Sequence, residues 1–216
     1  MIYIQKSTPP KKFQEFKQQN PQAHFEDILP DVKAVLRQSL LEEQGYLCAY
    51  CMSRIRDKVK IEHYEPRNPQ NELNYSNLLA VCTGNSAGDS FKRQHCDTKK
   101  GNKHLHINPQ NVDHIDQISY ESNGTIYAKD NEDFNNDLNL TLNLNDEHGY
   151  LKVNRKRALD ELKRKILDHC HDKTADCAYL EELLNFYSHI NEKGERRQYC
   201  GILIDYLVKR LKRWSQ

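Results

Sequence analysis

Residues 46–103 contain the sequence that predicts the fold, and they read YLCAYCMSRIRDKVKIEHYEPRNPQNELNYSNLLAVCTGNSAGDSFKRQHCDTKKGNK. The stretch opens with a CxxC knuckle formed by Cys48 and Cys51, and two further cysteines follow it, Cys82 and Cys96. Four thiolates complete a tetrahedral zinc site, and zinc in such a closed site contributes directly to folding. We therefore expect these four cysteines to bind one structural Zn²⁺ ion.

The spacing of the second cysteine pair leaves alternatives open. Cys82 and Cys96 are separated by a polar insert, residues 83–95, instead of by two residues. His95 is therefore an alternative zinc ligand, and a second alternative is that Cys82 and Cys96 are buried free thiols. A redox role for the knuckle is not favoured, because no βαβ pattern surrounds it.

A short strand is predicted between the two halves of the zinc site, at residues 59–66, VKIEHYEP. Neighbouring side chains on a strand point to opposite faces, so Glu62 and His63 can serve one site only through a bend, a bulge or a shared metal. Asn77 follows within the sequence LNYSNLL, and Asp97 comes directly after Cys96. Asp97 is expected in the first turn of a helix or at its N-cap.

The motifs CAYC, IEHYEP, NLLAVC and CDTKKGN together resemble an HNH endonuclease with the ββα-metal fold. The resemblance implies that the knuckle zinc is structural, that His63 is the general base and that Asn77 orients this base. It also implies that Glu62 and Asp97 hold a catalytic Mg²⁺ or Mn²⁺ ion. Two residues depart from the pattern, because Asp is commoner at position 62 and His or Asn is usual at position 97. Asn102, one helical turn further along, is the rival second metal ligand.

Hydrolysis of a phosphodiester bond suits these residue types. The reaction needs a deprotonated water, and a neutral histidine with a pKa of about 6.5 can take its proton near neutral pH. It also needs a cation for the charge that develops on phosphate, and carboxylate or carboxamide oxygens bind such hard cations. Lys99, Lys100 and Lys103 are expected to bind the flanking phosphates of the substrate.

A wider resemblance covers most of the chain. The opening MIYIQKS, the stretch LRQSLLEEQGYLCAYCMSRI and the sequence from LNYSNLLAVC to CDTKKGN are similar to PtuB-like HNH endonucleases of Septu and retron anti-phage systems. This resemblance implies a toxic effector bound to a PtuA-like ATPase and, in retron settings, controlled by a reverse transcriptase and its msDNA. The substrate stays open between DNA and RNA such as tRNA. The alternative function is a catalytically inactive, zinc-stabilised module that binds nucleic acid or protein.

The predicted fold class is α+β: a zinc-stapled ββα-metal (HNH) core with an N-terminal helix, a β-hairpin and a C-terminal helical region. Its segments are residues 1–45, an N-terminal extension and helix; 46–109, the nuclease core with the zinc knuckle; 110–153, a hairpin and acidic connector; and 154–216, a helical region for docking a partner.

Local patterns support these segments. Apolar residues near a 3.6-residue period predict a helix over 31–44, which Gly45 ends, and Asn123-Gly124 between two β-prone runs predicts a hairpin within 115–130. Alternating residues 135–145, NNDLNLTLNLN, predict a strand or an extended connector. Three apolar stripes within 159–170, 180–190 and 202–214 predict helices. Cys170 lies on the first stripe, so we interpret the neighbouring His169, His171 and Cys177 as part of a helical region and not as a second metal site.

Composition limits the function classes. The chain has 216 residues, of which 37% are apolar and 29% charged, and its mean hydropathy is −0.92. Because this leaves limited material for a large core, a metal or a partner protein would add stability. The sequence has neither a long apolar run nor the pattern of a secretion signal, so we expect a cytoplasmic protein in which the seven cysteines favour metal binding over disulfides. Residues 110–153 hold nine acids against two bases, so we expect a nucleic-acid substrate to avoid them.

Overall fold

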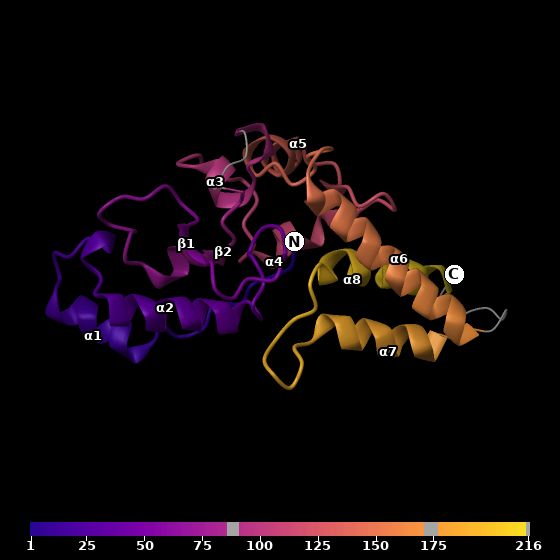
Figure 1. Ribbon diagram of the computed structural model, residues 1–216, viewed down its shortest axis with the longest axis horizontal. Helices are drawn as coiled ribbons and strands as arrows, with labels where there is room; N and C mark the ends of the chain where they lie inside the picture. The colour runs from indigo at the N-terminus through magenta and orange to yellow at the C-terminus, as the bar shows by residue number, and fades with distance from the viewer. Residues whose placement is uncertain (86–90, 171–176, 215–216) are drawn as a thin grey trace.

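The chain combines helices with two small antiparallel sheets, and the computed structural model describes residues 1–85, 91–170 and 177–214. Figure 1 shows the two N-terminal helices beneath the first sheet at one end of the molecule and three C-terminal helices at the other. In chain order the elements are α1 (Lys11–Gln19), a 3₁₀ turn (Phe25–Asp27), α2 (Pro30–Glu43), β1 (Lys60–His63), a 3₁₀ turn (Tyr75–Asn77), β2 (Leu78–Val81), a 3₁₀ turn (Phe91–Arg93), α3 (Cys96–Lys100), α4 (Val112–Asp116), β3 (Ile118–Tyr120), β4 (Ile126–Ala128), α5 (Glu132–Asn136), a π-helical turn (Asp137–Thr141), α6 (Tyr150–Cys170), α7 (Cys177–Ser188) and α8 (Cys200–Trp214).

Helix α2 leads the chain into the cysteine knuckle. Leu36 and Leu40, one turn apart, are fully buried, and the helix packs against β2. Gly45 follows the helix with a φ of +59°, a left-handed conformation that favours glycine at this position. The helix expected over residues 31–44 is therefore confirmed to within one residue at each end. The shorter α1 was not predicted, because Phe13 and Phe16 are its only buried residues.

Strands β1 and β2 pair in antiparallel register, with Lys60 opposite Val81 and His63 opposite Leu78. Every residue of β2 is buried, which agrees with its uninterrupted apolar sequence. The strand therefore carries Asn77, just before it, to the His63 end of the sheet. It carries Cys82, just after it, to the Lys60 end.

Side chains cover the outer edge of β2. The amide of Gln44 donates to the carbonyl oxygen of Ala80 at 2.7 Å and accepts from the Ala80 N–H at 2.8 Å. The ammonium of Lys6 donates to the carbonyl oxygen of Leu78 at 2.9 Å. These contacts satisfy backbone groups that a third strand would otherwise have to pair.

The expectation of a strand or extended connector over residues 135–145 is wrong, because this segment begins in α5 and continues into a π-helical turn. The side chain of Asn131 caps α5 by accepting from the Phe134 N–H at 3.1 Å. Leu138 and Leu142, four residues apart, are fully buried, whereas Leu140 between them is 65% exposed. The alternating sequence thus uses a helical spacing, and it buries only some of the leucines that a strand would place on one face.

The hairpin around Asn123-Gly124 is confirmed as β3 and β4, but Ile115 and Asp116 belong to α4 and not to the first strand. The C-terminal stripes form α6, α7 and α8, except that Ile190 of the second stripe lies beyond the end of α7 and is 56% exposed. Helix α6 begins at Tyr150, before the expected boundary at residue 154. Arg155 on α6 is 1% exposed and donates to the carbonyl oxygen of Gly124 at 2.6 Å, so it fastens the hairpin to the helix. None of the described helices is both long enough and apolar enough to cross a membrane.

Candidate metal centre and active site

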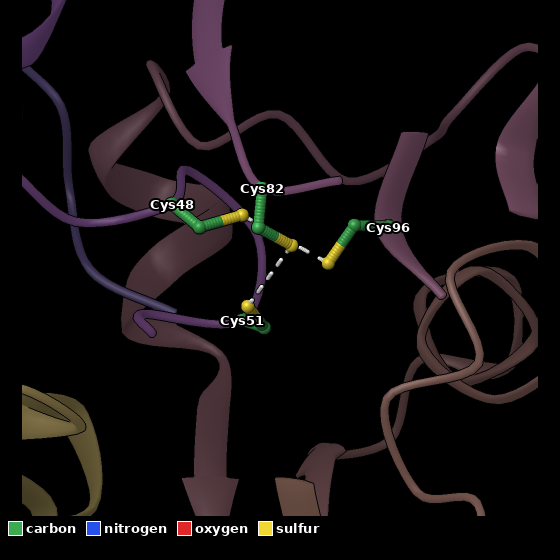
Figure 2. A group of neighbouring side chains, drawn as sticks. All are labelled: Cys48, Cys51, Cys82 and Cys96. Carbon is green, nitrogen blue, oxygen red and sulfur yellow. Dashed lines mark hydrogen bonds between the residues drawn. The ribbon is translucent and has the colours of Figure 1, made fainter. Parts of the chain in front are cut away.

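The structure brings the four predicted cysteines together. The sulfur atoms of Cys48, Cys51, Cys82 and Cys96 all lie within 4.8 Å of one another, and Figure 2 shows them turned toward a common centre. The Sγ atoms of Cys48 and Cys96 are 3.8 Å apart, as are those of Cys51 and Cys82. Tetrahedral zinc with a Zn–S distance of about 2.3 Å places its sulfur ligands about 3.8 Å apart. The donor set and its spacing therefore fit a four-thiolate zinc site.

Three separate segments supply these cysteines. Cys48 and Cys51 lie in a turn closed by the Cys48 N–H, which donates to the Ser53 carbonyl at 2.9 Å. Cys82 follows β2 directly, and Cys96 is the first residue of α3. Burial raises the pKa of the Cys51 thiol, but hydrogen bonds from the other three thiols lower this pKa well below its usual range. Neighbouring thiols raise the pKa of Cys82, and burial together with those thiols raises the pKa of Cys96, so the cluster favours the thiolate at Cys51 over these two.

His95, the alternative ligand, lies beside the cluster. It is 3% exposed, and its Nδ1 atom is 3.1 Å from the sulfur of Cys96. Its Nε2 atom is 2.9 Å from the hydroxyl of Tyr150 on α6. The four cysteines already provide a complete donor set, so this geometry suits a histidine that hydrogen-bonds to a coordinating sulfur and is itself oriented by Tyr150. Part of the insert before it, residues 86–90, lies outside the described residues.

Charged side chains lie between β1 and α3. We call Glu62, together with Asp97 and Lys100, the acid face of β1. Glu62 is 4% exposed, and its Oε1 atom is 2.7 Å from the ammonium of Lys100 and 3.2 Å from the hydroxyl of Tyr50. Lys100 also donates to the carbonyl oxygen of His63 at 3.0 Å. Asp97 accepts from the ammonium of Lys60 at 2.8 Å. One turn of α3 thus directs both Asp97 and Lys100 toward Glu62.

The two carboxyl groups of the acid face influence each other's pKa. Burial, followed by the neighbouring Asp97 carboxylate, raises the pKa of Glu62 to about 8 against the opposing effect of Lys100. Burial also raises the pKa of Asp97, but hydrogen bonds from Glu62 and Lys60 outweigh it and leave this pKa below its usual value. The pair therefore shares a proton, with Glu62 as the acid and Asp97 as the carboxylate. Two such carboxyl groups offer the oxygen ligands that Mg²⁺ or Mn²⁺ prefers.

The histidine face of β1, which we define as His63 with Phe25 and Glu72, lies on the opposite side of the strand. The Nε2 atom of half-buried His63 is 3.0 Å from the carbonyl oxygen of Glu72. Because a carbonyl can only accept, Nε2 carries the proton and Nδ1 holds a lone pair. Burial is the main cause that lowers the pKa of His63, which favours the neutral ring. The register is continuous through β1, so neither a bulge nor a bend brings Glu62 and His63 onto one face.

Asn77 contacts the backbone that follows His63 and not its ring. The side chain is 6% exposed, and its Oδ1 atom accepts from the N–H of Glu65 at 2.7 Å. Its Nδ2 atom donates to the carbonyl oxygen of Glu65 at 3.3 Å, and the Asn77 carbonyl accepts from the Tyr64 N–H at 2.9 Å. Asn77 therefore clamps the end of β1 directly beyond the histidine.

The predicted phosphate-binding lysines have different surroundings. Lys100 is 2% exposed and paired with Glu62, so the structure places it inside the site and not on the surface that we expected to meet phosphates. Lys103 is exposed, and Lys99 is half-buried. Asn102, the rival metal ligand, is exposed in the turn after α3. At the other end of the chain, Cys177 is exposed, Cys170 packs against the core, and His171 lies outside the described residues.

Comparison with known proteins found two curated relatives. The "Retron Ec83 putative HNH endonuclease" of Escherichia coli is 32% identical over 107 residues, which cover 43% of this chain and 42% of the relative. The "Retron Vc95 putative HNH endonuclease" of Vibrio cholerae serotype O1 biovar El Tor is 28% identical over 142 residues, which cover 61% and 66%. The relatives support an HNH endonuclease family in a retron context. The match covers less than two thirds of the length of either relative, and no family model matches the chain.

Sequence reasoning missed several neighbours of the predicted site residues. Lys100 lies three residues after Asp97, and this spacing on a helix could have indicated that both side chains face Glu62. Tyr50 lies inside the CxxC knuckle, where only the cysteines drew attention. Phe25 and Glu72 carry no local signal, because their contacts to His63 depend on chain segments that meet only in the folded protein.

Proposed function

We propose that this chain is a metal-dependent HNH endonuclease that hydrolyses phosphodiester bonds. The observation that carries the proposal is the surroundings of β1, where a neutral His63 with a free Nδ1 lone pair directly follows a buried Glu62 beside Asp97. The order β1, β2, α3, fastened by four clustered cysteines, supports a ββα-metal core. The retron relatives support the same assignment.

Each residue then has a chemical role. Nδ1 of His63 takes the proton of the attacking water, while the Nε2 hydrogen bond to the Glu72 carbonyl holds the ring. Glu62 and Asp97 would hold the divalent cation, with Asn102 as the alternative to Asp97. When bound, such a cation would stabilise the charge that grows on the phosphate and the leaving oxygen. Asn77 acts on His63 through the backbone of Tyr64 and Glu65, so it is a positioning residue.

The test is a cleavage assay on plasmid DNA and on RNA that includes tRNA, with added Mg²⁺ or Mn²⁺. We expect wild-type protein to cut one of these substrates and His63→Ala to lose this activity. His148→Ala is a matched control, because His148 is exposed and remote in sequence from the site. Equal cleavage by wild type and His63→Ala, in the presence of the partner proteins, would contradict the proposal.

A second candidate function is a zinc-stabilised binding module without catalysis. The observation that favours it is the buried ion pair of Lys100 with Glu62, which already gives the carboxylate a cationic partner. Under this alternative the acid face only stabilises the fold. Binding of Mn²⁺ separates the two candidates. The endonuclease is expected to bind Mn²⁺ and to lose this binding in Glu62→Gln, whereas the binding module is expected to have no such site.

The retron relatives and the resemblance to PtuB-like proteins lead us to propose a cellular setting as well. The endonuclease acts as the toxic effector of an anti-phage complex with a PtuA-like ATPase, under the control of a retron reverse transcriptase and its msDNA. The C-terminal helices provide a docking surface, since Leu167 on α6 and Phe186 on α7 are 68% and 44% exposed. Leu167→Glu combined with Phe186→Glu is expected to abolish co-purification with the ATPase. Unchanged binding by this variant would remove the helices from the interface.

A further inference from the structure

The carbonyl that holds His63 belongs to a residue whose own side chain is firmly bound. Glu72 lies in the loop between β1 and β2 and is 4% exposed. Its Oε2 atom accepts from the N–H of Phe25 at 3.0 Å, and its Oε1 atom is 2.6 Å from Nδ1 of His24. The Phe25 N–H and the His24 imidazole are the main causes that lower the pKa of Glu72, so this side chain is a carboxylate at neutral pH. Glu72 therefore joins the His63 loop to the N-terminal segment.

The same N-terminal segment touches the ring of His63 directly. Phe25 is 8% exposed, and its ring meets the imidazole edge to face, with centroids 4.6 Å apart and an interplanar angle of 78°. A reciprocal cap fixes the backbone here, since the His24 N–H donates to Asp27 at 2.8 Å and the Asp27 N–H donates to the His24 carbonyl at 3.0 Å. The segment is thus held both by its own hydrogen bonds and by the Glu72 carboxylate.

Two contacts are needed to set an imidazole. A hydrogen bond to Nε2 chooses the tautomer and fixes one direction of the ring, but it leaves rotation about that direction open. The edge-to-face contact with Phe25 restricts this rotation. Both contacts depend on Glu72, because its backbone oxygen makes the first and its carboxylate holds the backbone of the residue that makes the second.

We propose that Glu72 is a positioning residue whose carboxylate bridge to His24 and Phe25 fixes the tautomer and orientation of His63. The N-terminal segment is thereby part of the catalytic apparatus. The catalytic meaning of this inference rests on the proposed endonuclease function, whereas the tautomer can be measured without any substrate.

The first measurement is nitrogen-15 NMR of the histidine side chains in the full-length, zinc-loaded protein, with the His63 signals assigned by their loss in His63→Ala. Wild type is expected to show the Nε2–H tautomer of His63 alone. Glu72→Ala is expected to give a mixture of tautomers. Glu72→Gln is expected to restore the single form, because its amide oxygen still accepts from the Phe25 N–H. Glu26→Ala is the matched control, since Glu26 lies in the same turn but pairs with Arg67 at the surface.

The second measurement is cleavage of whichever nucleic acid the wild type cuts. Displacement of a catalytic group by about 1 Å can cost about 100-fold in rate, so we expect Glu72→Ala to lower kcat by 10- to 100-fold, on the order of such a displacement, with KM nearly unchanged. Glu72→Gln should recover most of this loss. A general structural defect would instead lower the amount of active protein, which active-site titration and thermal unfolding detect.

The outcomes separate the two claims. A wild-type tautomer and a wild-type kcat in Glu72→Ala would overturn the positioning role, and so would an equal loss in Glu26→Ala. A tautomer change in a protein that cuts no substrate would leave the positioning role intact and refute the endonuclease. If Glu72→Ala does not fold, His24→Ala tests the carboxylate bridge in its place. His24 has a largely exposed side chain, and an unchanged His63 tautomer and kcat in that variant would overturn the bridge.

Discussion

Glu62 and His63 are neighbours on β1, yet the two faces of the strand surround them with different chemistry. On the acid face, Glu62 lies among an ammonium, a carboxylate and a phenol in a buried space. On the histidine face, His63 meets a carbonyl and an aromatic ring. The first set of partners concentrates charge where a cation could bind, while the second keeps the imidazole neutral and oriented.

Under the proposed function, β1 divides one active site between its two faces. Two adjacent groups with opposite electrostatic needs stay apart because their side chains point in opposite directions. Lys100 links the faces, since its ammonium contacts both the Glu62 carboxylate and the His63 carbonyl. Substitutions on one face should therefore leave the function of the other measurable.

The largest effect is expected from a substitution that disrupts the acid face and the histidine face together. Cys48→Ser should lose the structural zinc, because the site needs four thiolates, and such zinc contributes about 10 kcal/mol or more to folding in small zinc domains. Elemental analysis is expected to give about one zinc per wild-type chain, and thermal unfolding should show loss of the transition in the variant. Cys177→Ser, an exposed thiol outside the cluster, is the control. A Cys48→Ser protein that keeps its zinc would refute the four-thiolate site.

The next largest effect is expected from a substitution that alters only the histidine face. His63→Ala should lower cleavage by about 100- to 10,000-fold, the usual contribution of a general base. Binding of Mn²⁺, followed by calorimetry, should stay within about twofold of wild type, since Glu62 and Asp97 are untouched. Loss of Mn²⁺ binding together with cleavage would show that the two faces are not independent.

The third effect breaks only the acid face. Above pH 8, where Glu62 is ionised, Glu62→Gln leaves the buried Lys100 ammonium without its charged partner, which costs about 3–5 kcal/mol when a buried pair is broken. The double variant Glu62→Gln/Lys100→Met should recover most of this stability in urea unfolding, yet it should bind no Mn²⁺. If Glu62→Gln unfolds at the wild-type urea concentration at pH 9, the ion pair does not stabilise the fold.

A smaller effect is expected at the end of the strand that both faces share. Asn77→Ala removes the side-chain partner of the half-buried Glu65 N–H, and loss of a hydrogen bond of this kind costs about 0.5–1.5 kcal/mol. Cleavage should fall while Mn²⁺ binding stays, because the clamp lies beyond His63. Asn77→Asp, which keeps the accepting oxygen, should lose less stability than Asn77→Ala in the same unfolding measurement. The reverse order would argue against the clamp.

The smallest effect is a pH dependence of the support behind the histidine face. The hydrogen bond to Glu72 is the main cause that raises the pKa of His24 above its ordinary value of 6.5, and Asp27 and Glu26 add to it. Stability from this shift is present in full below pH 6.5 and is lost as the pH rises through the raised value. The pKa of Glu72 is lowered from 4.5, so its contribution is lost only as the pH falls below that value.

The stability that His24 adds is therefore largest between about pH 4.5 and 6.5. Urea unfolding of wild type and His24→Gln at several pH values should show a difference that shrinks toward alkaline pH. A difference that is constant from pH 5 to 9 would mean that the imidazole charge has no part in the bridge.

Local patterns predicted much of this molecule. The CxxC knuckle, the short strand within residues 59–66 and the stripes of the last three helices each depend on neighbours within a few residues, and the structure contains them all. The long spacing between Cys82 and Cys96 gave no sign that they lie close together, but the fact that both are cysteines predicted a shared metal site. The prediction for residues 135–145 was wrong because the leucines there fit both the two-residue period of a strand and the four-residue spacing of a helix.

The surroundings of the site residues could not be predicted in the same way. His24 and Phe25 lie almost fifty residues before Glu72 in sequence, and their contacts exist only because α2 packs against β2. Burial of Lys100 likewise depends on where α3 lies across the sheet. Residue types thus indicated which groups react, whereas tertiary packing decides what holds them.

The covered edge of β2 has a consequence for assembly. Exposed strand edges recruit strands from other chains, in functional complexes as well as in aggregates. At this edge, the amide of Gln44 makes the two hydrogen bonds to Ala80 that the peptide unit of a third strand would make, and the ammonium of Lys6 donates to the Leu78 carbonyl. An extended peptide would have to expel a buried amide before it could pair here. A protein partner that contacts this edge of β2 must therefore recognise it through side chains and not through added β-structure.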